Sequence, residues 1–203
     1  MSRHMSFLPA GAALLVTALL LGTPGEAQRQ LDVPYVPTPQ PIVDKMLEMA
    51  EVTSSDYLID LGSGDGRIPI TAAQKYGINA YGVDLNPERI AEANANAKKA
   101  GVTDKVKFEE KNLFDTDISK ATVLTLYLLP SVNMQLRPRI LKELKPGTRV
   151  VSHSFDMGDW EADRTEKVDG KTLYKWVVPA QAEGSWQVKA EGGGSRDFKL
   201  ELD

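Results

Sequence analysis

Short apolar runs alternate with stretches of helical periodicity along most of this chain. Apolar runs predict strands at residues 57–61, 78–83, 106–110, 123–128 and 149–154. Apolar positions at helical spacing predict helices near residues 42–50, 67–76, 86–100 and 133–144. Strands that alternate with helices form a parallel sheet with helices on both faces. The expected fold class is therefore α/β.

The pattern changes after Trp160. Residues 172–178, 185–190 and 196–202 have the composition of strands, and no helical stretch separates them. Three consecutive glycines at 192–194 predict a turn between the last two strands. We therefore expect an antiparallel β appendage at the sheet edge from about residue 165.

Residues 1–27 have the pattern of a secretory signal peptide. Arg3 precedes an apolar run at 7–21, which is short for a membrane-spanning helix, and Gly25 and Ala27 are small residues suited to cleavage after Ala27. Cleavage would leave no membrane span and would place the protein in a bacterial periplasm or outside the cell. Without cleavage, residues 7–21 would anchor it to the membrane.

The rest of the chain divides into two predicted parts. Residues 28–55 form a proline-rich segment followed by the first helix, and residues 56–203 form the main domain together with its β appendage. Proline fixes φ and disfavours helix at the preceding residue, so residues 28–41 are expected to be extended.

Composition excludes several classes of site and gives no support for a nucleic-acid partner. The 203 residues include 24 Lys+Arg and 28 Asp+Glu, and the net charge of −4 gives no indication of nucleic-acid binding. Because there is no cysteine, disulfides and thiolate zinc sites are excluded. Removal of residues 1–27 leaves His153 as the one histidine, so no metal site is expected. His153 ends a predicted strand, and both a base and a structural role stay open for it.

The motif Asp60-Leu-Gly-Ser-Gly-Asp-Gly66 carries the main chemical signal. It follows a predicted strand and opens a helix, where glycine lets a ligand approach the backbone. A dinucleotide fingerprint needs glycine at position 67, which is Arg67. The spacing G-x-G-x-G, with an acid two residues earlier, is typical of S-adenosylmethionine (SAM) sites. Asp60 is placed to meet the methionine amino group.

Two later segments complete the predicted cofactor site. Asp84 ends the second strand, where a carboxylate can accept both ribose hydroxyls. Asn112 follows the third strand, and its amide can meet the adenine amine while Leu113 packs on the ring.

These motifs, including Asp84-Leu-Asn-Pro87, occur together with two narrower segments: Val33-Pro-Tyr-Val-Pro-Thr-Pro39 and Tyr127-Leu-Leu-Pro130. The set resembles class I SAM-dependent methyltransferases. Within that class it is similar to the lysine methyltransferases that modify the adenine nucleotide translocase and the ATP synthase c-subunit of mitochondria. The resemblance covers about residues 32–164.

The resemblance implies a Rossmann-like class I methyltransferase sheet, mostly parallel with an antiparallel C-terminal edge. It implies that Tyr35 and Thr38 fold over the cofactor, and that Tyr127 and Pro130 line the acceptor site. Tyr35, Tyr127 and Pro130 are thus the expected catalytic residues. The expected SAM contacts are Thr38, Asp60, Gly62, Ser63, Gly64, Asp84, Leu85, Asn112 and Leu113.

The expected reaction is methyl transfer from SAM to a protein lysine. A desolvated channel lined by Tyr35 and Tyr127 would disfavour the ammonium form of the acceptor. The chain lacks the Asn/Asp-Pro-Pro-aromatic loop of many nucleic-acid methyltransferases, so no nucleic-acid partner is expected. A small-molecule N- or O-methyltransferase acting on a small amine is one alternative. A non-catalytic SAM-binding exported protein is another, because SAM is made in the cytoplasm.

Overall fold

The computed structural model describes residues 35–180, 184–189 and 195–200, with side chains for 35–180. The predicted signal peptide and the alternative anchor at residues 7–21 lie outside these ranges. Within them, no helix is both long enough and apolar enough to cross a membrane.

A seven-stranded sheet forms the centre of the fold, in the order β3-β2-β1-β4-β5-β7-β6. Neighbouring strands among the first five are parallel, whereas β7 runs antiparallel to both β5 and β6. The predicted Rossmann-like sheet with an antiparallel edge is confirmed. The elements are α1 Gln40–Met49, β1 Tyr57–Leu61, α2 Arg67–Tyr76, β2 Asn79–Asp84, α3 Pro87–Ala100, β3 Val106–Glu110, η1 Leu113–Asp115, β4 Val123–Leu126, α4 Pro130–Glu143, β5 Arg149–His153, β6 Arg164–Val168, β7 Lys171–Val177, β8 Gly184–Lys189 and β9 Ser195–Leu200.

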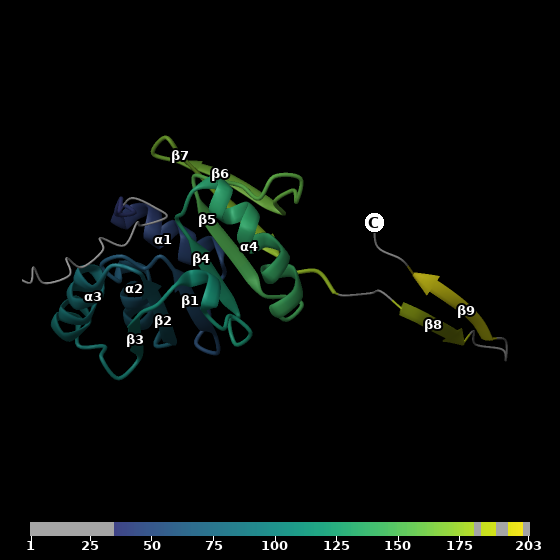
Figure 1. Ribbon diagram of the computed structural model, residues 1–203, viewed down its shortest axis with the longest axis horizontal. Helices are drawn as coiled ribbons and strands as arrows, with labels where there is room; N and C mark the ends of the chain where they lie inside the picture. The colour runs from purple at the N-terminus through teal and green to yellow at the C-terminus, as the bar shows by residue number, and fades with distance from the viewer. Residues whose placement is uncertain (1–34, 181–183, 190–194, 201–203) are drawn as a thin grey trace, which may run out of the picture. The chain divides into compact units, whose positions relative to one another are not determined.

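Helices cover both faces of this sheet (Figure 1). One face packs against α1, α2 and α3, where buried residues such as Met46, Ala72 and Ala93 meet Leu58 and Val151. The other face packs against α4, whose Leu136 and Ile140 meet Leu124, Leu126 and Val150. Strand side chains alternate between the faces, so each central strand supplies both cores.

The helix ends follow local sequence signals. Asn86 caps α3 by accepting a hydrogen bond from the Glu88 N–H, and Pro87 occupies the first helical position. Gly66 precedes α2 and Gly77 follows it, both in the left-handed region at φ 78° and 69°. These are backbone conformations that glycine adopts without penalty.

Two boundaries around the site differ from the prediction. Strand β4 ends at Leu126, so Tyr127 and Leu128 lie in a loop, and α4 begins at Pro130 rather than at Asn133. Proline is well suited to the first turn of a helix, where its missing N–H costs nothing. Pro138 lies inside α4.

The C-terminal strands also differ from the expected arrangement. The antiparallel extension consists of β7 and β6, and the sequence pattern does not predict β6 because Arg-Thr-Glu-Lys-Val carries no apolar run. Strands β8 and β9 form a two-stranded sheet of their own. The predicted turn at 192–194 between these two strands lies outside the described residues.

Candidate active site

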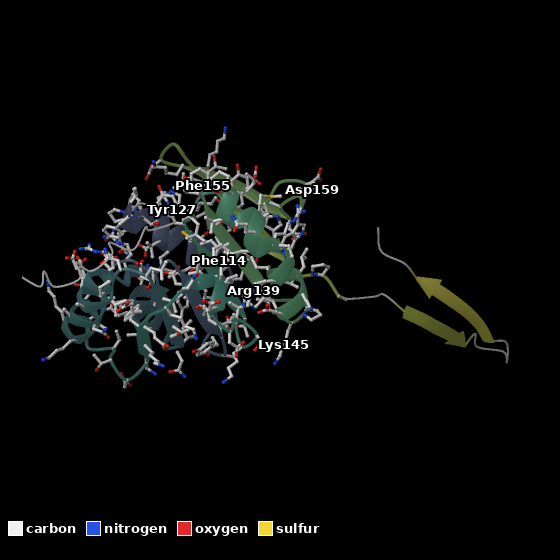
Figure 2. The ribbon with its side chains drawn as sticks, in the orientation of Figure 1. Phe114, Tyr127, Arg139, Lys145, Phe155 and Asp159 are labelled. Carbon is white, nitrogen blue, oxygen red and sulfur yellow. The ribbon has the colours of Figure 1, made fainter. Side chains whose placement is uncertain are left out.

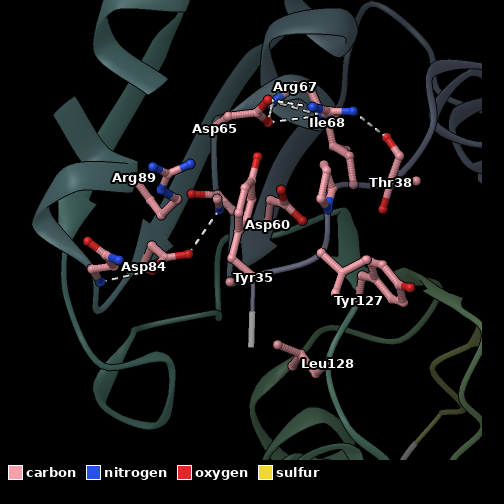
Figure 3. Close-up of a pocket in the computed structure, with 16 residues that line it drawn as sticks. Tyr35, Thr38, Asp60, Asp65, Arg67, Ile68, Asp84, Arg89, Tyr127 and Leu128 are labelled. Carbon is pink, nitrogen blue, oxygen red and sulfur yellow. Dashed lines mark hydrogen bonds and ion pairs between the residues drawn. The ribbon is translucent and has the colours of Figure 1, made fainter. Parts of the chain in front are cut away.

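A pocket lies where the carboxyl ends of the parallel strands meet (Figure 3). Ligands of open α/β sheets bind at this edge. The proline-rich segment, the glycine-rich turn after β1, the end of β2 and the loop after β4 all contribute. The lining residues are Tyr35, Val36, Pro37, Thr38, Asp60, Gly62, Ser63, Gly64, Asp65, Arg67, Ile68, Asp84, Asn86, Arg89, Tyr127 and Leu128.

Glycine is required twice at the base of this pocket. Gly62 and Gly64 have φ of 78° and 52°. A Cβ at Gly62 would lie 2.8 Å from Leu128 Cδ2, and one at Gly64 would lie 2.5 Å from Tyr35 Cε2. The turn is anchored because the Gly62 and Ser63 N–H groups donate to the Val83 carbonyl of β2. The side chains of Leu128 and Tyr35 therefore pack directly on this turn, which glycine alone allows.

Asp84 is held in one orientation at the end of β2. Its Oδ2 accepts from the Gly64 N–H at 3.0 Å, and its Oδ1 accepts from the Asn86 N–H at 2.9 Å. A carboxylate offers about four acceptor positions, so both oxygens keep capacity for a ligand's hydroxyl groups. This is the geometry that a ribose diol requires.

Asp60 is the deepest acid of the pocket and only 3% exposed. The Thr125 hydroxyl from the neighbouring strand β4 donates to its Oδ1 at 2.7 Å. Burial raises the pKa of Asp60 to about 7; the Thr125 bond opposes this, and the charges of Asp84 and Asp65 add to it. A cation entering the pocket would favour the ionised form.

The proline-rich segment closes one side of the pocket. The Tyr35 ring lies against Gly64, and the Arg89 guanidinium lies 4.6 Å from the centre of that ring. Arg67 donates to the Thr38 carbonyl at 2.7 Å and forms an ion pair with Asp65 at 2.6 Å (Figure 3).

The sequence pattern predicts no site role for Asp65, Arg67 or Arg89. In the sequence, Arg67 stands where a dinucleotide-binding motif needs glycine, and this excludes that motif without indicating a role for Arg67. In the structure, Arg67 ties the proline-rich segment to the glycine-rich turn. Its position after the glycines, at the first turn of α2, was the available indication of this role.

The loop after β4 forms the opposite wall. Tyr127 is half-buried and lines the pocket, and its ring stacks toward Phe155 with centroids 6.4 Å apart (Figure 2). Pro130 is exposed at the start of α4 and does not line the pocket. The structure thus brings Tyr127 to the pocket and leaves Pro130 outside it.

Three predicted cofactor contacts also lie outside the pocket lining. Asn112 caps η1, with its Oδ1 accepting from the Phe114 N–H at 2.9 Å. Leu113 is buried in the core beside α4, and Leu85 is half-buried after β2. Their roles in adenine binding stay predictions. The other predicted contacts, Thr38, Asp60, Gly62, Ser63, Gly64 and Asp84, all line the pocket, as does Tyr35.

The pocket fits SAM on three independent features. Ser63 Oγ is buried and has no hydrogen-bond partner among the described residues, so it is a polar atom that a ligand can satisfy. Gly62 and Gly64 line the pocket without side chains of their own. Asp60 and Asp84 offer carboxylates to an ammonium group and to ribose hydroxyls. Among the described residues, no group of His, Asp or Glu could hold a metal ion.

Fold and site together define a class I SAM-dependent methyltransferase. Residues 60–164 match the family model of the ANTKMT methyltransferase domain, and the chain belongs to this family. SAM is therefore its cofactor.

Three relatives illustrate the match. A protein-lysine N-methyltransferase of Saccharolobus islandicus is 51% identical over 151 residues, covering 72% of this chain and 94% of the relative. The mouse lysine N-methyltransferase of the ATP synthase c-subunit is 31% identical over 171 residues, covering 84% of this chain and 68% of the relative. A crystal structure of an RNA methyltransferase from Salinibacter ruber with S-adenosyl-L-homocysteine is 55% identical, covering 72% and 95%, with a TM-score of 0.71.

Proposed function

We propose that this enzyme transfers the methyl group of SAM to the ε-amine of a protein lysine. The observation that carries the proposal is the aromatic wall formed by Tyr127 and Phe155 beside the acidic cofactor pocket. The relatives from Saccharolobus and mouse, both named as lysine methyltransferases, support the same acceptor class.

The chain's own residues account for the chemistry that methyl transfer needs. SAM supplies an electrophilic methyl group on a sulfonium. Asp60 and Asp84, which line the pocket, would hold the bound cofactor and so restrict the position of its reacting carbon. The half-buried aromatic wall disfavours the charged form of an incoming lysine, which promotes loss of its proton.

RNA is a second candidate acceptor, because the relative from Salinibacter is named as an RNA methyltransferase. The charges of the pocket do not favour it. Arg67 is paired with Asp65, and Arg89 is paired with Glu92, so both cations that line the pocket are already engaged. Phosphate contacts supply most of the affinity in nucleic-acid binding, and the net charge here is −4.

The test supplies the protein with SAM carrying a labelled methyl group. Proteins of the source cell's envelope and cytoplasm, total RNA and small amines are offered in parallel. Mass spectrometry of labelled peptides then identifies the modified side chain. The Asp84→Ala variant serves as the inactive enzyme, and Asp104→Ala, at an exposed position after α3, serves as the matched control.

Label on lysine that depends on Asp84 but not on Asp104 supports the proposal. Label on RNA or small amines in preference to protein would overturn it. No turnover despite SAM binding would also overturn it, in favour of a non-catalytic SAM-binding protein.

A further inference from the structure

His153 is a buried titratable residue that the proposed chemistry does not use. It ends β5, is fully buried, and does not line the pocket. Burial, aided by the charge of Lys171, lowers its pKa to about 4, so the ring is neutral at physiological pH. A neutral ring adds no charge against a cationic cofactor.

The ring of His153 contacts both walls of the pocket. Its Nδ1 is hydrogen-bonded to Thr38 Oγ1 at 3.1 Å, across 115 residues of sequence. Its ring centre lies 3.8 Å from that of Tyr127, at an interplanar angle of 32°. Thr38 belongs to the cofactor side, where Arg67 also holds its carbonyl, and Tyr127 belongs to the acceptor side.

Packing alone does not account for histidine at this position. Its Nε2 is buried with no hydrogen-bond partner among the described residues. An unpaired buried polar atom destabilises the folded state. Phenylalanine would fill a similar space without that cost, but it would lose the bond to Thr38. The one polar contact shown for the ring is therefore the contact with the cofactor wall.

We propose that His153 is a positioning residue that sets Thr38 for the cofactor and Tyr127 for the acceptor. Its Nδ1 holds the Thr38 hydroxyl by a hydrogen bond, and the face of its ring packs against the Tyr127 ring. The acceptor half of this inference rests on the proposed lysine methyltransferase function, whereas the cofactor half does not.

Two substitutions separate the two contacts. His153→Phe keeps an aromatic ring against Tyr127 but loses the bond to Thr38. His153→Asn keeps a polar atom near the place of Nδ1 but loses the ring. Calorimetry with S-adenosylhomocysteine gives the Kd, and methyl transfer at saturating SAM gives kcat. Thr148→Val is the matched control, because it removes a buried hydrogen bond, to the Ala121 carbonyl, at the opposite end of β5.

A crossed pattern is expected. His153→Phe should raise the Kd about 3- to 10-fold, as the loss of one buried hydrogen bond predicts, and lower kcat less than His153→Asn does. His153→Asn should bind S-adenosylhomocysteine nearly as the natural protein does but lose about 10-fold in kcat, because Tyr127 is no longer held. Thr38→Val should raise the Kd as His153→Phe does, and combining the two should add little.

The proposal is overturned if both variants stay within about twofold of the natural protein in Kd and kcat. It is also overturned if both parameters change together, in proportion to a fall in melting temperature, as for Thr148→Val. If the natural protein methylates no lysine, the proposed function fails. The Kd values of His153→Phe and Thr38→Val still decide the cofactor half.

Discussion

At the scale of single residues, the buried acid Asp60 combines a cost in stability with a role in binding. Its pKa of about 7 lies above the ordinary value of 3.8, so the neutral form is favoured in the folded protein without ligand. The stability from this neutral form is fully present below about pH 4 and is lost as pH rises through 7. A cationic cofactor reverses the preference.

Asp60→Asn should therefore raise the melting temperature of the ligand-free protein more at pH 8 than at pH 5, because the penalty grows between the unfolded pKa of 3.8 and the folded pKa of about 7. It should also weaken SAM binding by at least about tenfold, because the uncharged amide cannot balance the ammonium group. Thermal melts at both pH values and calorimetry with SAM measure these effects. An equal gain at pH 5 and pH 8 would contradict the ionisation described for Asp60.

Asp84 is partly exposed, so we expect its substitution to affect cofactor binding rather than folding. Asp84→Ala removes the acceptor of the Gly64 and Asn86 N–H groups, which water can replace. We expect a folded protein whose SAM affinity falls by about 100-fold, as for the loss of paired charge-assisted hydrogen bonds. Calorimetry checks the affinity and circular dichroism checks the fold. Affinity equal to that of Asp104→Ala would remove the ribose assignment.

At the scale of elements, the two ends of α2 allow a matched comparison. Gly66 and Gly77 are both left-handed, but a Cβ at Gly77 meets open space, whereas one at Gly66 would lie 2.5 Å from Phe108 Cζ of β3. Gly77→Ala should cost about 1 kcal/mol of unfolding free energy from backbone strain alone. Gly66→Ala should cost about 2–4 kcal/mol, because overpacking adds to that strain. Urea denaturation measures both, and equal losses would show that Phe108 moves aside freely.

At the scale of the whole molecule, the sequence makes a prediction about where the enzyme acts. We propose that residues 1–27 direct export and are removed, which the charged start, apolar run and small residues of the sequence support. Mass spectrometry of the protein from its source cell should then find an N-terminus at Gln28. Ala27→Arg should block cleavage, since a small residue is needed there. A natural N-terminus at or near Met1 would instead favour the anchor at residues 7–21.

Much of the fold follows from local signals in the sequence. Runs of apolar residues predict the five parallel strands, and Asn86-Pro87 predicts the start of α3. Closely spaced glycines predict the turn after β1. Each of these signals depends on only a few neighbouring residues. Strand β6 was missed because its charged residues lie on an edge, where pairing rather than burial makes the strand. The antiparallel pairing of β8 with β9 agrees with the two strands predicted on either side of Gly192–Gly194.

Part of the cofactor pocket could be predicted from the sequence, although Leu85, Asn112 and Leu113 do not line it. An acid, three glycines and a second acid at the next strand end have fixed places in a parallel sheet, so their spacing located Asp60, Gly64 and Asp84 in the pocket. Two contacts become visible only in the folded chain: Arg67 donates to the Thr38 carbonyl, and His153 lies between Thr38 and Tyr127. These contacts join segments distant in sequence, and their geometry depends on how strands and helices pack, which no local pattern records.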